Sequence, residues 1–388
     1  MIKNFPESIE ACAAYYGNAA DAMRTYLIDG HQRAAALPNR GPIRFTADGS
    51  LDPAIRAAYS EYGFYIFEEL YCAAELDDLQ QDMSRMRQQF PVAPEAALNA
   101  QGGPALGADC KAPSLQWVKP LSDPLGGTAH FNGRHQVKLF EPKAAIDAPA
   151  YSPFVLSGHL QFSEACLRAY AHPELLKLCA AINGEDFTPF NDTIFFKDPG
   201  LGAAVAWHQD GDTHWENPLF DENIHGFNLM LQLYGSTAVN GVWVVPGSHK
   251  LGRLDIKQMI ADAGSERLPD AVPMLCNPGD VVISNRQLVH GSFANTGFEP
   301  RVTVNFGCHR LSSVLDVKGA GMHSEVAVYD AAFIRERSHV LGLAIEARKQ
   351  RYPQEQAYTY KPLAGETYVW NAQALKSIKD YNLRDLSI

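Results

Sequence analysis

Hydrophobic residues recur at two different periods along the chain, and the period changes after residue 187. In the first part, apolar positions repeat every three to four residues, for example at Leu76, Leu79, Met83 and Met86, which is the spacing of one helix face. From 187 to 309 the apolar runs are short and are separated by Gly, Pro and Asn, which is typical of strands joined by turns. The pattern predicts a β-sandwich or barrel with flanking helices.

The same reasoning gives approximate bounds for the elements. Helices are predicted within residues 1–37, 52–62, 73–90, 163–183, 254–263 and 325–352. Strands are predicted at residues 64–67, 193–197, 227–234, 241–245, 280–284 and 301–308. Residues 91–135 are rich in Gly, Pro and Ala, and we expect a long irregular segment there, near the mouth of a site.

The chain is expected to form one domain over residues 1–388. Within it we expect an N-terminal helical extension at 1–50, a β core with flanking helices at 50–310, and a C-terminal helical extension at 311–388. The last of these is a candidate lid over the mouth of the β core.

Composition narrows the function classes. The chain has 388 residues, of which 46% are hydrophobic and 20% charged, so it can bury a sizeable core and is not a disordered chain. A formal net charge of -11 argues against non-specific binding of nucleic acid. The seven cysteines form no CxxC pair, which favours reduced thiols in a cytoplasmic protein. We see neither a secretory leader nor an apolar run long enough for a membrane span, so no membrane partner is expected.

One set of polar residues lies within the predicted strands and suits a metal ion. His208 and Asp210 are two residues apart, so in a strand they face the same side, and His290 follows 82 residues later after the strand that begins at Asp280. Two imidazoles and one carboxylate can hold one face of Fe(II) and leave the other face open. Arg301 follows 11 residues after His290, and its planar guanidinium suits a dicarboxylate.

Other interpretations of this pattern remain open. A lone His-x-Asp is more often structural than metal-binding, and here it is the combination with His290 and Arg301 that favours a metal. His214 together with Asp212 is an alternative ligand pair, although Gly211 suggests that the strand ends before it.

At this point the residues resemble a known family. The chain is similar to the phytanoyl-CoA dioxygenase family of Fe(II)- and 2-oxoglutarate-dependent oxygenases over roughly residues 50–310. The resembling stretches are Tyr62-Gly-Phe-Tyr-Ile-Phe67, Phe196-Lys-Asp-Pro-Gly200, Trp207-His-Gln-Asp210, Val245-Pro-Gly-Ser-His249, Asn277-Pro-Gly-Asp280 and His290-Gly-Ser-Phe-Ala-Asn295. The resemblance implies a double-stranded β-helix (a cupin-like jelly roll), with Fe(II) as the metal, 2-oxoglutarate as co-substrate and O2 as oxidant.

The resemblance also implies roles for individual residues. His208, Asp210 and His290 would be the iron ligands and the catalytic centre. Arg301 would bind the distal carboxylate of 2-oxoglutarate. The remaining co-substrate contacts would come from the hydroxyls of Ser292 and Thr303 and from a supporting side chain, Gln209.

The carboxylate at Asp210 bears on the reaction type. In related halogenases a small residue replaces it, whereas its presence here makes hydroxylation the default outcome, with release of succinate and CO2. Desaturation, epoxidation and cyclisation use the same centre. Two other classes compete with this interpretation: a non-catalytic jelly roll that only binds metal, and a cupin-like metal enzyme that does not use 2-oxoglutarate. Arg301 argues against both, because an unpaired buried guanidinium is costly.

The substrate is expected to be a small or medium-sized specialised metabolite. Its expected contacts are Trp207, Asn228, Met230, Gln232 and Lys138, with Trp215 and Trp243 as further aromatic candidates. The aromatic side chains are more often core residues, and Asn228 and Gln232 are as well explained by support of the metal ligands. Lys138 belongs to a basic cluster with Arg134 and His135, which could meet an anionic group of the substrate or the co-substrate, although a solvated face is the simpler explanation. The oligomeric state is not predicted.

Overall fold

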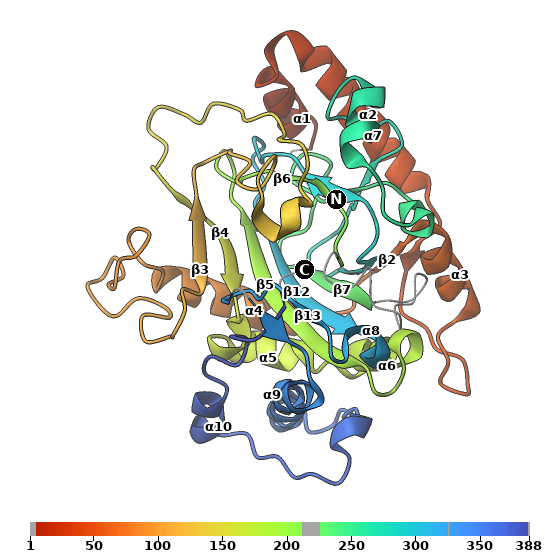
Figure 1. Cartoon of the computed structure of the whole chain (residues 1–388), viewed down its shortest axis with the longest axis vertical. Coiled ribbons are helices and arrows are strands. Elements are labelled where there is room, and N and C mark those ends of the chain that lie inside the picture. Colours follow the sequence, from red (N-terminus) through yellow and green to blue (C-terminus); the bar gives the residue numbers. More distant parts are fainter. Residues whose placement is uncertain (1–4, 212–225, 325, 387–388) are drawn as a thin grey trace.

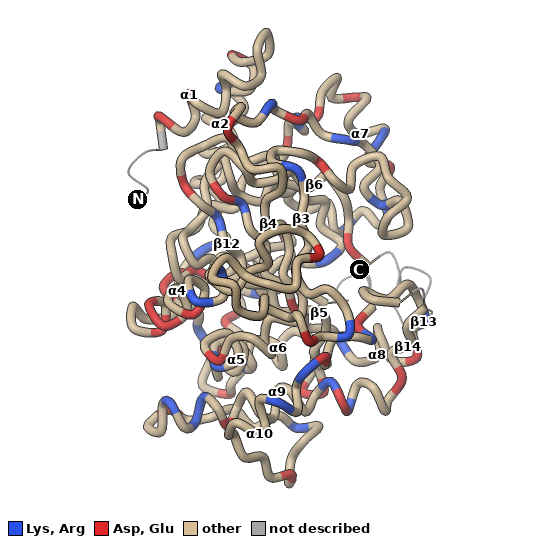
Figure 2. Tube along the Cα trace, turned by 90° about the vertical axis from the view of Figure 1, so that its left-hand side faces the viewer, with Lys and Arg blue, Asp and Glu red and all other residues tan. Residues whose placement is uncertain are grey.

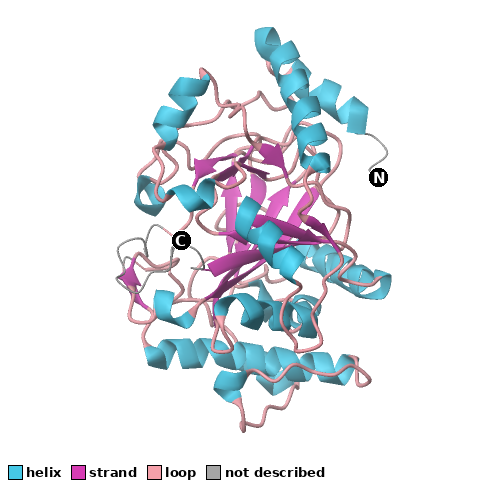
Figure 3. Ribbon diagram, turned by 90° about the vertical axis from the view of Figure 1, so that its right-hand side faces the viewer, coloured by secondary structure: helices cyan, strands magenta, loops and turns pink. Residues whose placement is uncertain are grey.

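Two mainly antiparallel β-sheets lie at the centre of the protein in this computed structural model, and helices surround them (Figure 1). The structure describes residues 5–211, 226–324 and 326–386. The larger sheet has the strand order β1-β2-β10-β7-β12-β5-β4-β3, and the smaller sheet has the order β6-β11-β8-β9. Figure 3 shows the strands grouped in the middle, with the helices above and below them.

The larger sheet is built mostly from long central strands and short edge strands. Its members in chain order are β1 Arg40–Gly41, β2 Phe64–Phe67, β3 Leu115–Val118, β4 Ser152–Ser157, β5 Thr188–Lys197, β7 Gly226–Gln232, β10 Val281–Asn285 and β12 Arg301–His309. The smaller sheet contains β6 Val205–His208, β8 Trp243–Val244, β9 Val272–Pro273 and β11 His290–Ser292. A separate hairpin joins β13 Lys318–Gly319 and β14 Ala327–Val328.

The helices form an N-terminal group and a group that packs on the larger sheet, and short 3-10 helices occur in the connections. The α-helices are α1 Phe5–Ala14, α2 Ala20–Ala36, α3 Pro53–Tyr62, α4 Ala73–Gln88, α5 Glu164–Tyr170, α6 Pro173–Asn183, α7 Ile256–Ala263, α8 Leu311–Val314, α9 Ala331–Arg351 and α10 Ala372–Ser377. Short 3-10 helices are η1 Gly17–Ala19, η2 His130–Gly133, η3 His159–Gln161, η4 Ser248–Leu251 and η5 Lys361–Leu363.

One face of the larger sheet forms the main core together with α4, α5, α6 and α9. Ile194 of β5, Leu231 of β7 and Val304 of β12 are fully buried in one cluster with Met83 of α4 and Leu341 of α9. Because successive strand residues point to opposite faces, the residues between them are left for the other face of the sheet. That other face lines the cavity described below.

The N-terminal helix α2 packs on the smaller sheet. Its buried residues Met23, Leu27, Gly30 and Ala34 recur at four-, three- and four-residue steps, which place them on one helix face. A Cβ atom at Gly30 would lie 2.2 Å from the ring of Trp243, so the close approach of α2 to β8 requires a glycine there.

Local signals explain why some predicted bounds agree with the structure. The predicted strand 64–67 is β2. Helix α3 begins at Pro53, directly after the N-cap Asp52, and ends before the C-cap Gly63, whose φ is +80°. The predicted helix 163–183 is wrong as a single helix, because it is divided before Pro173 into α5 and α6. The strands β3 and β4 were not predicted, and β3 lies within the segment 91–135 that was expected to be irregular.

The C-terminal extension lies mainly on the side of the larger sheet away from the cavity. Its long helix α9 packs against α5, and both lie in the lower part of Figure 1. Among its described residues, Met322 lines the cavity. A role of this extension as a lid stays a prediction, as does the division of the chain at 50 and 310. No helix in the described part of the chain is long and apolar enough to cross a membrane.

Candidate metal centre

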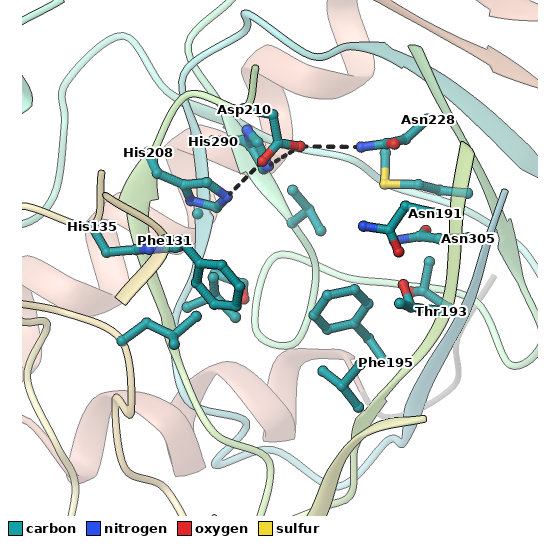
Figure 4. Close-up of a pocket in the computed structure, with 18 of the residues that line it drawn as sticks. Phe131, His135, Asn191, Thr193, Phe195, His208, Asp210, Asn228, His290 and Asn305 are labelled. Carbon is teal, nitrogen blue, oxygen red and sulfur yellow. Dashed lines mark hydrogen bonds and ion pairs between the residues drawn. The ribbon is translucent and has the colours of Figure 1, made fainter. Parts of the chain in front are cut away.

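A cavity of about 140 Å³ lies between the two sheets. The smaller sheet contributes His208 and His290 to its wall, and the larger sheet contributes Thr193, Arg301 and Asn305 (Figure 4). Both groups come from strands in which alternate side chains point inwards. The cavity is therefore enclosed by the inner faces of the β core.

Three potential metal ligands meet at one end of this cavity. His290 of β11 lies directly opposite His208 of β6 in the antiparallel register, and their rings are 4.1 Å apart between centroids. Asp210 follows β6, with its Oδ1 at 3.5 Å from Nε2 of His208 and its Oδ2 at 3.9 Å from Nε2 of His290. One ligand atom from each residue lies within 4.8 Å of the other two. This donor set and spacing fit one face of a transition-metal ion.

The backbone sets the orientation of both imidazoles. Nδ1 of His208 lies 2.8 Å from the carbonyl oxygen of Ala206, and Nδ1 of His290 lies 2.9 Å from that of Leu288. A carbonyl oxygen can only accept a hydrogen bond, so Nδ1 carries a proton, and in the neutral ring Nε2 keeps its lone pair. Both lone pairs face the cavity side where Asp210 lies. Burial and the neighbouring His208 lower the pKa of His290 to about 3, which keeps its ring neutral and able to bind a metal.

Asp210 is held as an anion by its surroundings. Its amide donates to the carbonyl oxygen of Arg286 at 2.8 Å. Its carboxylate lies 3.2 Å from Nη2 of Arg134 and 3.5 Å from Nη2 of Arg286, and it accepts from Nδ2 of Asn228 at 3.3 Å. Burial raises the pKa of this carboxyl, but Arg134 and Arg286 outweigh burial and hold the pKa well below its usual range. The group is therefore ionised and available as a ligand at neutral pH.

A buried guanidinium lies on another wall of the same cavity. Arg301 is 2% exposed, and its Nε and Nη1 have no hydrogen-bond partner among the described residues. Burial lowers its pKa to about 10, so it stays charged at neutral pH. Beside it in the register, Lys197 donates to the carbonyl oxygen of Phe293, and burial, then the charge of Arg301, lowers the pKa of Lys197 well below its usual value. Arg301 is thus an unsatisfied cation that suits a carboxylate from outside the protein.

The two hydroxyl residues predicted beside the co-substrate also line the cavity. Ser292 lies two residues after His290 on β11, and Thr303 lies two residues after Arg301 on β12. The hydroxyl of Thr303 donates to Oε1 of Gln232 at 2.9 Å.

Four predicted contacts need correction, because the side chains do not line the cavity. Gln209 binds the carbonyl oxygens of Gly252 and Gln287 and the amide of Leu254, and these bonds make it a brace between loops. Trp207 lies in the core and donates through Nε1 to the carbonyl oxygen of Glu266.

The other two corrections have different causes. Gln232 lies at the end of β7, where its amide oxygen is taken by Thr303. Lys138 is exposed and pairs with Glu141 at 2.9 Å. Trp243 is also a core residue, stacked on Tyr26 with ring centroids 4.5 Å apart.

Asn228 and Met230 line the cavity as predicted. Asn228 donates to Asp210 and accepts from Nη1 of Arg286 at 2.6 Å, so its side chain supports a metal ligand. The alternative ligands His214 and Asp212, and the aromatic candidate Trp215, lie outside the described residues.

Sequence reasoning missed three cavity residues near the triad. Arg286 comes from the turn after β10, and Arg134 and His135 come from the end of η2. The ring of His135 lies 4.2 Å from that of His208, and the side chain of Arg134 is 10% exposed, so a solvated face is the wrong description of both. The cluster of basic residues at 134–138 was visible in the sequence, but nothing in it indicated which members turn inwards.

Comparison with known proteins agrees with this geometry. Residues 59–303 match the family model described as "Phytanoyl-CoA dioxygenase (PhyH)". Among curated proteins, the chain is 34% identical over 135 residues to "Phytanoyl-CoA dioxygenase 1" of Oryza sativa subsp. japonica, which covers 32% of this chain and 43% of that protein. It is 31% identical over 139 residues to "Dioxygenase lolE1" of Epichloe uncinata, covering 35% and 51%. The matches thus span about half of each relative.

Among solved structures, the chain is similar to EctD from S. alaskensis, crystallised with 2-oxoglutarate and 5-hydroxyectoine. The TM-score is 0.50 at 20% sequence identity, with 71% of this chain and 81% of that chain covered. At this identity the likeness concerns the fold, and the predicted jelly-roll core with flanking helices is confirmed.

Proposed function

The chain belongs to the phytanoyl-CoA dioxygenase family, and on this premise we propose that it is an Fe(II)- and 2-oxoglutarate-dependent oxygenase that acts on a small molecule. The observation that carries the proposal is the meeting of two partial sites in one cavity. The triad of His208, Asp210 and His290 offers ligands on one wall, and the unpaired guanidinium of Arg301 faces the same space from another.

The residues present fit an Fe(II) ion. The Nε2 atoms of His208 and His290 and one carboxylate oxygen of Asp210 would hold one face of the ion and leave the other face open for a co-substrate and O2. The carboxylate of Asp210 is held in place by contacts with Asn228, Arg134 and Arg286, as carboxylates that bind metals commonly are.

The residues present also fit 2-oxoglutarate. A planar guanidinium can bind a carboxylate through two parallel hydrogen bonds, and burial strengthens them. Arg301 would hold the distal carboxylate, and the hydroxyl residues Ser292 and Thr303 line the same cavity as Arg301 and the triad. Lys197 donates its hydrogen bond to the carbonyl oxygen of Phe293, whereas Nε and Nη1 of Arg301 have no partner in the described part of the chain and can bind a carboxylate.

The protein's contribution to the chemistry is position and exclusion of water. Iron bound to the triad would couple the decarboxylation of 2-oxoglutarate by O2 to oxidation of the substrate. Asp210 occupies the position that a halide would need, so hydroxylation is the default outcome, and desaturation, epoxidation and cyclisation use the same residues. The enclosed cavity restricts water near the reacting atoms.

We further propose a small or medium-sized specialised metabolite as the substrate class. The cavity lies between two sheets and has a volume of about 140 Å³, which suits a small molecule. The relatives named for phytanoyl-CoA oxidation share only part of their length with this chain, and they do not define its substrate.

The direct test measures succinate formation by the purified protein with Fe(II), 2-oxoglutarate and O2, with each omitted in turn. We expect slow succinate formation that requires all three and rises when a substrate is added. Metal binding without succinate would favour a non-catalytic jelly roll. Consumption of O2 that ignores 2-oxoglutarate would favour a cupin-like enzyme of another type.

A further inference from the structure

Three polar side chains gather at the end of the cavity away from Arg301. On β12, Arg301, Thr303 and Asn305 point inwards in alternation, and four residues of strand place Asn305 about 13 Å from Arg301. Asn305 lies opposite Thr193 of β5 in the register, and Asn191 follows on the same strand face. Figure 4 shows Asn191, Thr193 and Asn305 side by side, apart from the triad.

A β-bulge turns Asn191 towards the cavity. The pairing of β12 with β5 shifts between Phe306 and Gly307, so Asn191 has no direct partner on β12, and its φ is +32°. This backbone conformation is strained for a residue with a side chain. A Cβ at position 307 would lie 2.1 Å from the carbonyl oxygen of Phe190, so the bulge also needs Gly307. Strain of this kind persists where surrounding contacts enforce it, and it often marks functional sites.

Buried ionic contacts enforce the strand from behind. Asp192, between Asn191 and Thr193, faces the other side of the sheet and binds the guanidinium of Arg337 from α9 and the hydroxyl of Tyr381. Arg337 also binds Asp385 at 3.2 Å. The C-terminal extension, which lies outside the matched residues 59–303, thus supports this end of the cavity.

The side chains of Asn191, Thr193 and Asn305 determine which kind of ligand group can bind beside them. Asn191, Thr193 and Asn305 are uncharged, and Oδ1 of Asn305 is buried with no hydrogen-bond partner in the described part of the chain. An unsatisfied buried acceptor is unfavourable, and a donor on a ligand would satisfy it. A charged ligand group would lose its hydration here, and none of these three side chains would supply a counter-ion. The rings of Phe131 and Phe195 line the adjoining wall and suit a carbon skeleton.

We propose that Asn191, Thr193 and Asn305 form a substrate-recognition subsite for an uncharged hydrogen-bonding group, either a hydroxyl or a carboxamide. The inference rests on the proposed function. Recognition by these three side chains would determine which carbon of the substrate faces the proposed metal ligands.

The test measures binding of four matched probes to the full-length protein loaded with Mn(II) and 2-oxoglutarate without O2. The probes are 3-phenylpropanamide, 3-phenylpropan-1-ol, butylbenzene and 3-phenylpropanoate, which share a ring and differ in one terminal group. For the wild type we expect the amide and the alcohol to bind about 10-fold more tightly than butylbenzene, the value of one hydrogen bond, and more tightly than the carboxylate.

The variant Asn305→Leu removes the amide at similar size and should abolish this preference. The control Asn18→Leu changes an exposed asparagine far from the cavity and should behave as the wild type. Titration of Mn(II) shows that each variant is folded. Tightest binding of the carboxylate, equal binding of all probes, no binding of any probe, or a preference that survives Asn305→Leu would each overturn the proposal.

The failure of this inference and that of the proposed function are distinguishable. Absence of succinate with the probe preference intact would reject oxygenase activity and keep a binding subsite. Succinate formation dependent on Fe(II) and 2-oxoglutarate, without any probe preference, would reject the subsite alone.

Discussion

The cavity has two ends that are built by different means. At the metal end, His208 and His290 lie directly opposite each other in the antiparallel pairing of β6 and β11, and the backbone orients both rings. At the far end, Asn191 reaches the cavity through a bulge, and its neighbour Asp192 is held by residues after 310. The first end lies wholly within the residues that match the family, and the second depends on contacts outside them.

The difference teaches which part of the site can vary independently. A change in the C-terminal extension can alter the far end while the register of β6 and β11 stays the same. We therefore expect variants at the metal end to lose turnover of 2-oxoglutarate, and variants behind the far end to keep metal binding.

The largest effect is expected from Asp210→Ala. The change removes one of three ligands and leaves Arg134 and Arg286 without their carboxylate. Succinate formation should fall by more than about 100-fold, since changing only the partners of metal ligands already costs up to that much. Exposed Asp21, changed to alanine, is the control and should keep full activity. Activity of Asp210→Ala within a few-fold of the wild type would contradict the proposed role of the metal end in 2-oxoglutarate turnover.

Arg301→Met should give the next largest effect. It removes two charge-assisted hydrogen bonds, each worth about 1.5–3 kcal/mol, and should raise the apparent KM for 2-oxoglutarate by about 100-fold or more. The affinity for Mn(II), measured by calorimetry, should not change. Arg301→Lys keeps the charge without the planar fork and should fall between the wild type and Arg301→Met. An unaltered requirement for 2-oxoglutarate would contradict the assignment.

Arg337→Met tests the support of the far end. Asp192 and Asp385 would lose a buried counter-ion, which typically costs about 3–5 kcal/mol of stability. Urea unfolding measures this loss, and the exposed Arg335→Met is the matched control, expected within about 0.5 kcal/mol of the wild type. The folded variant should still bind Mn(II). A parallel loss of metal affinity would mean that the two ends are one rigid unit.

The smallest effect concerns pH. Burial raises the pKa of Asp385 to about 6, with Arg337 opposing and Asp192 reinforcing the shift. The folded protein therefore holds this proton more tightly than the unfolded chain, so the contribution to stability is full below the unfolded pKa and is lost as pH rises through about 6. Between pH 7 and pH 4, the wild type should gain up to about 3 kcal/mol over Asp385→Asn. If the unfolding free energies of the wild type and Asp385→Asn changed with pH in parallel, Asp385 would not contribute to the pH dependence of stability.

Sequence reasoning succeeded where strand periodicity alone decides the outcome. The two-residue alternation placed His208 beside Asp210, and Arg301 beside Thr303, and the structure has each pair in the cavity. The same alternation could have excluded Trp207 and Gln209, which flank His208 and point the other way. Gln232 shows a limit of the rule. It lies on the same strand face as Asn228 and Met230, but its amide oxygen accepts a hydrogen bond from Thr303 and the side chain does not line the cavity.

The residues that were missed come from places where no period applies. Arg286 comes from a turn, and Arg134 and His135 follow a 3-10 segment whose residues Phe131 and Asn132 have positive φ. Their inward direction depends on tertiary contacts, which local sequence does not report.

The histidine orientation has a consequence for how this protein tolerates change. Each imidazole is tethered to a main-chain oxygen two positions upstream, at Ala206 and at Leu288. Every amino acid carries that oxygen, so replacing either residue would not untie the ring. The hydrogen bonds that orient the metal-facing nitrogens are therefore made by the main chain, and substitutions of the neighbouring side chains do not remove them.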